Sequence, residues 1–392
     1  MQNNIISNKH TMISQIQKIF SSKFSDQSIL IKSPGRINLI GEHTDYNNGF
    51  VMPAAIDNAM YFAIGKNGNS ILDIYSFNYE ESIVFKKLEK LATPSWGSYF
   101  KAILEILKEK GFPIQGVQCV FGGNIPIGAG LSSSAALCCG FIFGLSELFN
   151  LKIKREEIAK IGQAAEHRIG LNCGLMDQYA VLFGKKDHVF CLDCENLEIK
   201  YIPFKLENHT LVLINSNIEH QLASADSEYN VRRASCEKVV ELISKDFPKI
   251  KSLRDIDAPL LEKYKNEIQP IDFQRVSYVV KENGRVHQVI DLLEKNDLEE
   301  IGNVLLQGHH GLSKEYEVSL PELDILVDLT KKEAGVLGAR LMGGGFGGAT
   351  INLVANENKP AALANIKQQY FEMTGLECKM HEVNIEDGVK RI

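Results

Sequence analysis

A loop rich in glycine and serine, residues 126–136, points most directly to chemistry. It reads Pro-Ile-Gly-Ala-Gly-Leu-Ser-Ser-Ser-Ala-Ala and runs into the apolar segment 135–149, whose length and lack of proline predict a buried helix. Gly128 and Gly130 let the backbone approach a ligand closely, and residues 132–134 are serines that can cap the helix. Free N–H groups at a helix N-terminus bind anions, most often phosphate. The loop therefore predicts a phosphate site, with an ordinary capped turn as the alternative.

This loop is not a P-loop of the familiar type. The pattern Gly-x-x-x-x-Gly-Lys-[Ser/Thr] occurs nowhere in the chain, and the loop contains no lysine. A helix terminus alone contributes about 0.3–2 kcal/mol toward holding an anion. A triphosphate would therefore need a metal ion held by serine hydroxyls and a carboxylate.

A second polar loop, residues 41–49, carries two carboxylates, a histidine, a threonine and two asparagines, and Arg36 stands just before it. Its apolar flanks, residues 37–40 and 50–55, would anchor it on buried strands. Each sugar hydroxyl needs both a donor and an acceptor, so a rigid polar loop suits a small polyhydroxylated ligand. The alternative is a solvated turn, because loops carry polar residues by default.

Two further features are candidates for function. Asp177 lies between Met176 and the apolar run 179–183, where a carboxylate usually has a partner, although a helix N-cap is a common use of aspartate. The glycines of segment 342–348 match Gly-x-Gly-x-x-Gly, but residues 349–354 predict a strand where a dinucleotide site needs a helix. We therefore expect a glycine-rich turn that packs closely against another loop.

The elements that must position these residues follow from hydrophobic periodicity. Helical spacing is found in residues 11–24, 94–110, 155–168 and 224–243, and the span to about residue 312 is helical in pattern. Extended segments are expected at 28–39 (interrupted at Pro34-Gly35), 71–85, 116–121, 189–203 and 211–215. The length of 392 residues suggests two or three domains, and we place a boundary near residue 208, giving residues 1–207 and 208–392.

Composition excludes several classes of protein. The 43 basic and 49 acidic residues give a net charge of −6, and no basic run stands out, which argues against nucleic-acid binding. The most apolar run is too short to cross a bilayer, and no secretory signal is visible. We therefore expect a cytoplasmic protein with no membrane partner, and we further expect a monomer. Its eight cysteines, including the lone Cys191-x-x-Cys194 pair, are expected to be reduced thiols.

Three motifs, taken in order, resemble those of the GHMP small-molecule kinases, and among them the galactokinases. They are Gly-Arg-Ile-Asn-Leu-Ile-Gly-Glu-His-Thr-Asp-Tyr at residues 35–46, the loop at 126–136, and Leu-Met-Gly-Gly-Gly-Phe-Gly-Gly at 341–348. The first motif is specific to galactokinase-like sugar kinases, and the other two are shared across the superfamily. The resemblance implies an α+β fold of two domains with the active site in the cleft between them. It also implies ATP-dependent phosphorylation of the C1 hydroxyl of α-D-galactose, as part of galactose metabolism.

The resemblance also implies roles for individual residues. Asp177 and Arg36 would be catalytic, and the sugar-binding residues would be Glu42, His43, Thr44, Asp45 and Tyr229. The ATP phosphates would lie against Gly128, Ala129, Gly130, Leu131, Ser132, Ser133 and Ser134, and Ser134 with Glu166 would hold Mg²⁺. The third motif would support the cleft and would not bind the nucleotide itself.

The transfer would be direct and in line, so positioning and charge stabilisation would dominate catalysis. A general base typically accelerates such a reaction by about 10²–10⁴-fold. A large share of the rate enhancement would therefore come from the magnesium ion and the loop N–H groups. The sequence leaves open whether Asp177 is the base or orients the hydroxyl while Arg36 stabilises the developing alkoxide.

Alternative functions also remain open. The sugar could instead be N-acetylgalactosamine, arabinose or galacturonate, since kinases of these sugars share the motifs. A sensor that binds galactose and ATP without catalysis, or a purely structural partner, is disfavoured because the serine loop, Arg36 and Asp177 are all present.

Overall fold

The computed structural model describes residues 2–24, 27–68, 72–85, 96–126, 128, 130–171, 173–218 and 228–392. A six-stranded sheet forms the first half of the molecule, with the strand order β13-β1-β3-β6-β4-β5. The strands, in that order, are Lys390–Arg391, Ile29–Asn38, Pro53–Lys66, Val117–Gly123, Leu72–Ser76 and Glu81–Phe85. All pairs are antiparallel except β4 with β6.

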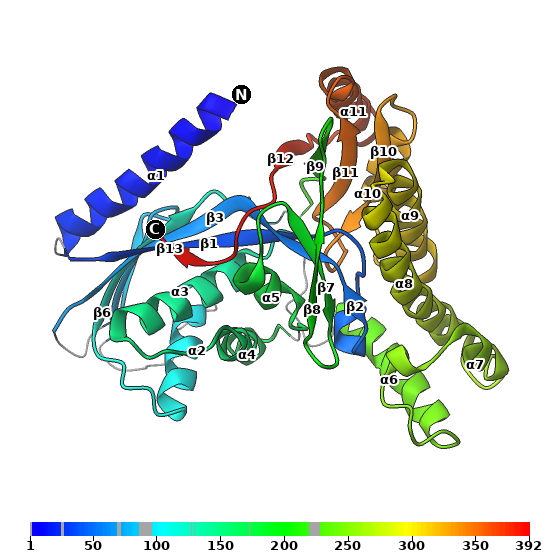
Figure 1. The fold of residues 1–392 in the computed structure, drawn as a ribbon, viewed down its shortest axis with the longest axis horizontal. Helices are drawn as coiled ribbons and strands as arrows, with labels where there is room; N and C mark the ends of the chain where they lie inside the picture. Colours follow the sequence, from blue (N-terminus) through cyan, green and yellow to red (C-terminus); the bar gives the residue numbers. More distant parts are fainter. Residues whose placement is uncertain are drawn as a thin grey trace.

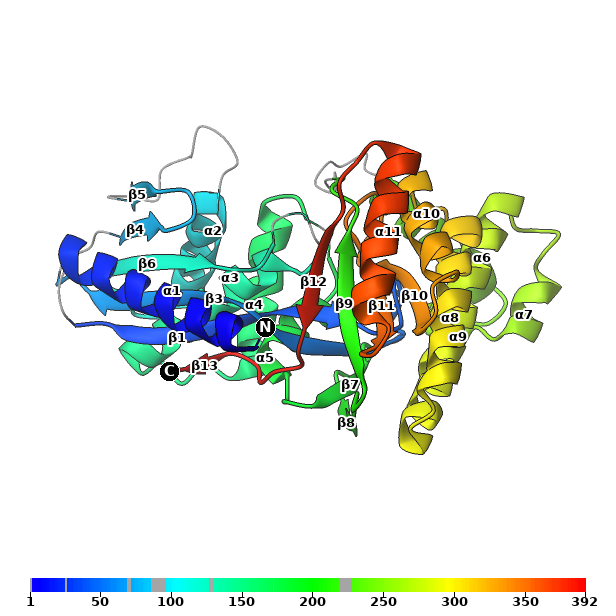
Figure 2. The same cartoon turned by 90° about the horizontal axis from the view of Figure 1, so that it is seen from above.

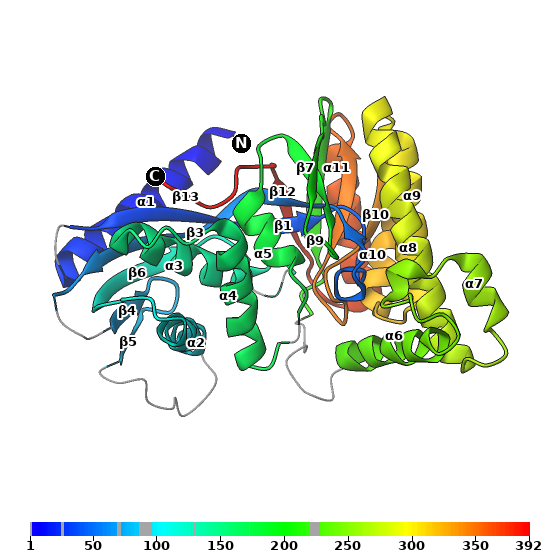
Figure 3. The same ribbon diagram turned by 60° about the horizontal axis from the view of Figure 1, so that its bottom comes forward.

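Helices cover both faces of this sheet (Figure 1). Helix α1 (Gln2–Lys23) lies on one face, and α2 (Trp96–Glu109), α3 (Ser133–Phe149), α4 (Arg155–Arg168) and α5 (Met176–Phe183) gather on the other, as Figure 3 shows. Helix α3 lies very close to the strands because it carries two glycines at the contact. A Cβ on Gly140 would stand 2.6 Å from Phe62, and one on Gly144 would stand 2.3 Å from Ile64. This contact fixes the serine loop, which leads into α3, relative to the sheet.

A four-stranded antiparallel sheet, β10-β11-β9-β12, forms the second half. Its strands, in that order, are Val336–Met342, Ala349–Ala355, His209–Asn215 and Lys379–Val383. The helices of this half are α6 (Glu228–Ser244), α7 (Ala258–Lys263), α8 (Pro270–Lys295), α9 (Leu298–His310), α10 (Pro321–Thr330) and α11 (Lys359–Thr374). Figure 2 shows this sheet beside the first one, with α8 and α9 on its outer side. A small sheet of β2 (Phe50–Val51), β7 (His188–Asp193) and β8 (Ile199–Pro203) lies near the junction.

The α+β expectation is confirmed, since two mainly antiparallel sheets are packed with helices. The boundary near residue 208 stays a prediction. Strand β9, which starts just after it, belongs to the second sheet, but the end of the chain returns to the first half. There β13 pairs with β1, and Ile385 bridges Ile56.

Two local expectations need correction. Helix α1 begins at Gln2, well before residue 11, because the polar residues that precede the periodic segment give no hydrophobic signal. Strand β1 is not interrupted at Pro34-Gly35 but continues through a register shift between Pro34 and Arg36. Proline has no N–H to donate to a ladder, and a bulge accommodates it. Beyond this shift the backbone N–H of Arg36 donates to the carbonyl of Leu131, at 3.2 Å, in the serine loop.

Two further observations bear on the cysteines and on membrane-spanning segments. All eight cysteines are free thiols. Among the described helices, none combines the length and the apolar character that a bilayer crossing requires.

Candidate active site

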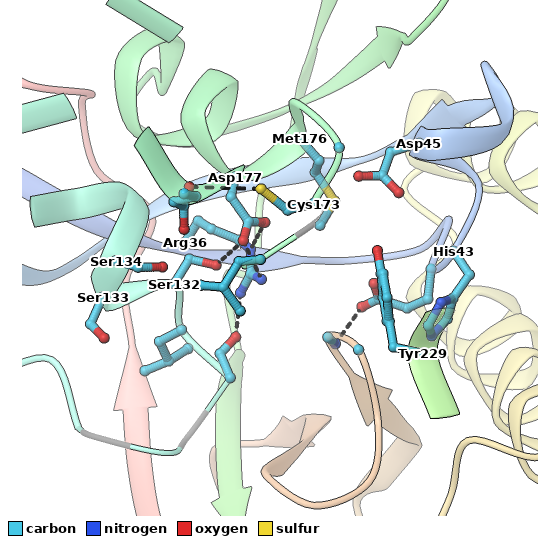
Figure 4. A pocket seen from close by; sticks show the side chains of 18 of the residues that line it. Arg36, His43, Asp45, Ser132, Ser133, Ser134, Cys173, Met176, Asp177 and Tyr229 are labelled. Atoms are coloured by element: carbon cyan, nitrogen blue, oxygen red, sulfur yellow. Dashed lines mark hydrogen bonds and ion pairs between the residues drawn. The ribbon is translucent and has the colours of Figure 1, made fainter. Parts of the chain in front are cut away.

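A cavity of about 250 Å³ lies where the two halves meet, and both halves line it. The first half supplies residues of the polar loop, the serine loop and the segment before α5, and the second half supplies α6 and the third motif. The lining residues are Arg36, Glu42, His43, Asp45, Pro126, Gly128, Gly130, Leu131, Ser132, Ser133, Ser134, Glu166, Leu171, Cys173, Gly174, Met176, Asp177, Tyr229, Gly343 and Gly344. Motifs separated by about 300 residues along the chain therefore meet in one place. Figure 4 shows their side chains as two groups, one around Asp177 and the other around His43.

Asp177 is held by a bidentate ion pair. Arg36 Nε lies 2.7 Å from Oδ1, and Arg36 Nη2 lies 3.2 Å from Oδ2. Ser132 donates its hydroxyl to Oδ2, while Arg36 Nη1 donates to the carbonyl of Gly130. The Asp177 side chain is 23% exposed and that of Arg36 only 5%. Asp177 is neither an N-cap, since Leu175 holds that position in α5, nor a solvated surface residue.

The serine loop differs in detail from the expected capped turn. Ser132 is the N-cap of α3, but its backbone is left-handed (φ 53°) and its side chain makes no capping bond. The expectation of a cap is therefore wrong for Ser132, because its hydroxyl is turned toward Asp177 instead. Ser133 and Ser134 open α3 and line the cavity, as do Gly128, Gly130 and Leu131. The predicted phosphate contact at Ala129 lies outside the described residues.

Glu166 is buried beside the serine loop and is hydrogen-bonded to Ser134 and Gln178. Burial raises the pKa of Glu166 to about 7, and the nearby charge of Asp177 acts in the same direction. A buried carboxyl next to another carboxylate is stabilised in its ionised form by a cation. The chemistry of Ser134 and Glu166, both oxygen donors, therefore fits a hard ion such as Mg²⁺. No group of three or more His, Cys, Asp or Glu side chains suited to a metal occurs in the described part of the chain, so substrate oxygens would have to complete the coordination.

Glu42 is almost fully buried and is fixed from the second half of the chain. Its Oε1 accepts from Arg340 Nη1 at 3.1 Å and from the backbone N–H of Gly343 at 2.8 Å. The glycine-rich third motif thus contacts the polar loop directly. The close packing expected of this motif is confirmed, because a Cβ on Gly345 would stand 2.3 Å from the carbonyl oxygen of Val318.

His43 belongs to a buried group of aromatic side chains. Its Nδ1 lies 2.8 Å from the hydroxyl of Tyr46, which lies 2.8 Å from the hydroxyl of Tyr316. The ring centroid of Tyr229 lies 5.5 Å from that of His43. Burial lowers the pKa of His43 to about 3, and the positive charge of Arg232 contributes in the same direction. His43 is therefore a neutral ring at physiological pH, so it can interact with a hydroxyl without carrying charge.

Asp45 points into the cavity, and its carboxylate occupies the space over Gly174. A Cβ on Gly174 would stand only 1.9 Å from Asp45 Oδ2. Burial raises the pKa of Asp45 to about 7, and the charge of Asp177 adds to this effect. The carboxyl is therefore divided between its neutral and ionised forms near neutral pH.

Thr44 is the one residue of the predicted sugar-binding set that does not line the cavity. It is fully buried, and its hydroxyl lies 2.9 Å from the carbonyl oxygen of Gly41 and 2.6 Å from that of Phe50. The structure places this side chain inside the loop, where it ties the two ends of the loop together.

Sequence reasoning missed two residues at this site, Arg340 and Gly174. Arg340 stands in the apolar run Ala339 to Met342, and a charged residue in such a run is a signal for a buried partner. Gly174 gave no signal of its own, because a close approach by Asp45, 129 residues earlier in the chain, is visible only in three dimensions.

Family models match three parts of the chain. Residues 18–66 match the galactokinase galactose-binding signature, residues 98–185 the N-terminal domain of GHMP kinases, and residues 289–372 their C-terminal domain. A galactokinase of Thermotoga maritima is 38% identical over 367 residues, which is 92% of this chain and 99% of that protein. A galactokinase of Fusobacterium nucleatum is 38% identical over 388 residues, which is 97% of this chain and 99% of that protein.

Solved structures agree with the sequence relatives. The crystal structure of Lactococcus lactis galactokinase complexed with galactose superposes with a TM-score of 0.92 at 32% identity and covers 97% of this chain and 100% of that one. A mevalonate kinase structure, at 19% identity and a TM-score of 0.64, shares the fold and covers 92% of this chain. Sequence identity over nearly the whole length, the three family models and the fold all lead to one conclusion. The chain belongs to the galactokinases of the GHMP kinase family.

Proposed function

We propose that the chain is a sugar 1-kinase that transfers the γ-phosphoryl group of ATP to the C1 hydroxyl of α-D-galactose. The observation that carries this proposal is the meeting of the serine loop, the Arg36–Asp177 pair and the polar loop at a single cavity. The names of the relatives support galactose as the sugar.

The two groups of side chains in Figure 4 suggest that each group binds a different substrate. We assign the sugar to Glu42, His43, Asp45 and Tyr229, and the ATP phosphates to the serine loop, residues 128–134. Thr44 is proposed to support the sugar-binding loop, because both atoms near its hydroxyl are backbone oxygens.

Asp177 would contact the acceptor hydroxyl at the junction of the two groups. Both of its carboxylate oxygens already accept from donors, two from Arg36 and one from Ser132. These three bonds fix the orientation of the carboxylate, as a group that positions a hydroxyl requires. We therefore favour Asp177 as the group that orients the hydroxyl, with Arg36 stabilising the negative charge that develops on the attacking oxygen.

Mg²⁺ would be held by Ser134 and Glu166 together with phosphate oxygens and water. When bound, the ion would neutralise charge on the phosphate oxygens during transfer. Glu166 and Ser134 themselves supply oxygen donors at the base of the serine loop, and Gln178 keeps the Glu166 carboxyl oriented through its amide.

A coupled ADP-release assay with galactose, glucose, N-acetylgalactosamine and arabinose tests the proposal. We expect the highest kcat/KM with galactose, a requirement for Mg²⁺, and a product with the phosphate on C1 by phosphorus NMR. Preference for another sugar would replace galactose but leave the chemistry in place. Tight galactose and ATP binding without ADP release would instead support a sensor.

We also propose a domain division, an oligomeric state and a cellular location. They are the two-domain division at residues 1–207 and 208–392, a monomeric state and a cytoplasmic location. Light scattering after size exclusion tests the monomer, and limited proteolysis tests whether cleavage concentrates near residue 208.

A further inference from the structure

Arg340 is the largest fully buried side chain of the protein among the residues described, and it lies at the end of β10 just before the third motif. Its guanidinium donates to the carbonyl oxygens of Leu39 at 2.9 Å and Leu341 at 2.7 Å, and also to that of Asn38. Its remaining bond is the ion pair with Glu42 Oε1. A buried arginine is costly unless each N–H has a partner, and three of these four partners belong to the first half of the chain.

The two oxygens of the Glu42 carboxylate are in different situations. Oε1 receives two donors, Arg340 Nη1 and the N–H of Gly343, whereas Oε2 has no hydrogen bond with any residue that the structure describes. Glu42 lines the cavity and its side chain is only 3% exposed. Rotation of the carboxylate would break two bonds at once, so its orientation is fixed.

The backbone of Glu42 is also held from the second half. Glu282, fully buried in α8, accepts from the N–H groups of Gly41 at 2.9 Å and Glu42 at 3.3 Å. The hydroxyl of Tyr278 donates to the carbonyl of Glu42 at 3.1 Å. With both the peptide and one carboxylate oxygen fixed, only Oε2 remains to interact with a ligand.

We propose that Arg340 is a positioning residue for sugar recognition, which occupies Glu42 Oε1 so that Oε2 is presented to the cavity as a fixed hydrogen-bond acceptor. This inference rests on the proposed binding of a sugar at Glu42. The ligand group at this position must then be a hydroxyl that donates, and a sugar lacking that hydroxyl is bound weakly. Gly343, together with Arg340 just before the motif, also gives the third motif a function, which is to orient a residue of the first half.

A double-mutant cycle on Arg340→Lys and Glu42→Gln tests whether Arg340 acts through Glu42. A lysine lacks the planar fork and cannot serve all four acceptors. Alone, R340K is expected to raise the KM for galactose about tenfold to a hundredfold, with the KM for ATP and kcat within about threefold of the original values. In the E42Q background, R340K should raise the KM for galactose by less than about threefold more. Effects that multiply independently would overturn the proposal.

Arg254→Lys is the matched control. Arg254 also comes from the second half and also anchors the polar loop, through the carbonyl of Asn48 at 3.3 Å. Its ion pair is with Asp193 at the end of β7, and it does not touch Glu42. R254K should therefore lower stability without the selective change in galactose KM. An equal rise in galactose KM for R254K would show that any loosening of the loop suffices, and would overturn a specific role for Arg340.

Glu42→Gln decides the question if R340K does not fold. The two donors on Oε1 select the amide oxygen of glutamine, so its NH₂ group must point into the cavity where an acceptor is needed. We expect a melting temperature close to that of the original protein and a loss of galactose affinity of about tenfold or more by calorimetry. Near-normal affinity would mean that the amide rotates freely, and it would overturn the proposal.

Deoxygalactoses identify the hydroxyl concerned. With the original protein one of the deoxy sugars should lose about tenfold or more in affinity, and with E42Q that penalty should disappear. A penalty that persists in E42Q for every deoxy sugar would contradict the assignment of Oε2. Turnover of the original protein on the sugar panel is measured first. If another sugar is phosphorylated, or if sugar binds without turnover, the proposed function fails while the binding measurements on that sugar still decide the role of Arg340.

Discussion

Replacement of Gly174 by alanine is expected to displace Asp45 and to disable sugar binding without touching the phosphate loop. The added Cβ would stand 1.9 Å from Asp45 Oδ2 and 2.5 Å from its Cγ. A Cβ atom essentially never approaches another heavy atom closer than 3.0 Å, so the carboxylate must move by more than about 1 Å. A misplacement of about 1 Å at a reacting or positioning group costs about 10²-fold. We therefore expect kcat/KM for galactose to fall about a hundredfold, while the KM for ATP changes little.

Steady-state kinetics with each substrate varied in turn measures this effect. Gly284→Ala is the matched control, because the same change in α8 meets no atom within 4 Å and an alanine favours a helix. In an Asp45→Ala background, Gly174→Ala should add little, since the group it displaces is gone. The reasoning is refuted if G174A retains kcat/KM within threefold of the original value, or if its effect is undiminished when Asp45 is absent.

The remaining predictions concern the transfer step, pH and the polar loop. Asp177→Asn should lower kcat about 10²–10⁴-fold while calorimetry still detects galactose and ATP, and near-normal kcat would remove Asp177 from the mechanism. The pKa of Asp45 is raised to about 7 in the folded chain, so folding favours the neutral carboxyl. The contribution of Asp45 to stability is therefore complete below about pH 4 and is lost as the pH rises through 7. Denaturant titrations without ligands measure this effect as the free energy of unfolding of the original protein relative to that of Asp45→Asn. This difference should fall by about 2 kcal/mol between pH 5 and 8, a figure that already allows for solvent at the open side of the cavity. A rise over this range would show that the sign is wrong. Thr44→Val should reduce the free energy of unfolding by about 1–3 kcal/mol, because the two buried carbonyls that share its single O–H lose that donor. A loss of galactose affinity at unchanged stability would instead place the Thr44 hydroxyl at the sugar.

Local sequence patterns predicted most of the elements around the site. The helix at Arg155–Arg168 has the expected bounds, and strand β11 after the third motif excludes a dinucleotide site as expected. Such elements are read correctly because the period of their apolar residues reports which face is buried. The polar start of α1 and the bulge in β1 were read incorrectly, since neither is marked by periodicity.

The candidate site was predictable as a set of residues but not as an arrangement. The sequence pointed to Asp177 as a carboxylate in need of a partner, and the structure supplies Arg36 and Ser132, which lie 141 and 45 residues away. The sequence also suggested that the serine hydroxyls cap α3, whereas the left-handed backbone of Ser132 turns its hydroxyl to Asp177. Tertiary contact decided which of several chemically reasonable partners each polar group took.

The sequence alone supplied the three motifs, and through their resemblance to the GHMP kinases it implied the fold class and most of the polar side chains at the cavity, because a motif is a local property of the chain. Only the tertiary structure decided that Arg340 occupies one oxygen of Glu42, that Gly174 makes room for Asp45, and that Thr44 is turned inward. The first contact joins residues 298 positions apart and the second joins residues 129 positions apart, and no local pattern encodes such distances. The Thr44 bonds are short along the chain but depend on the folded shape of the loop. The Arg340–Glu42 contact arises when the two halves pack together, because each buried polar group must then find a partner across the junction.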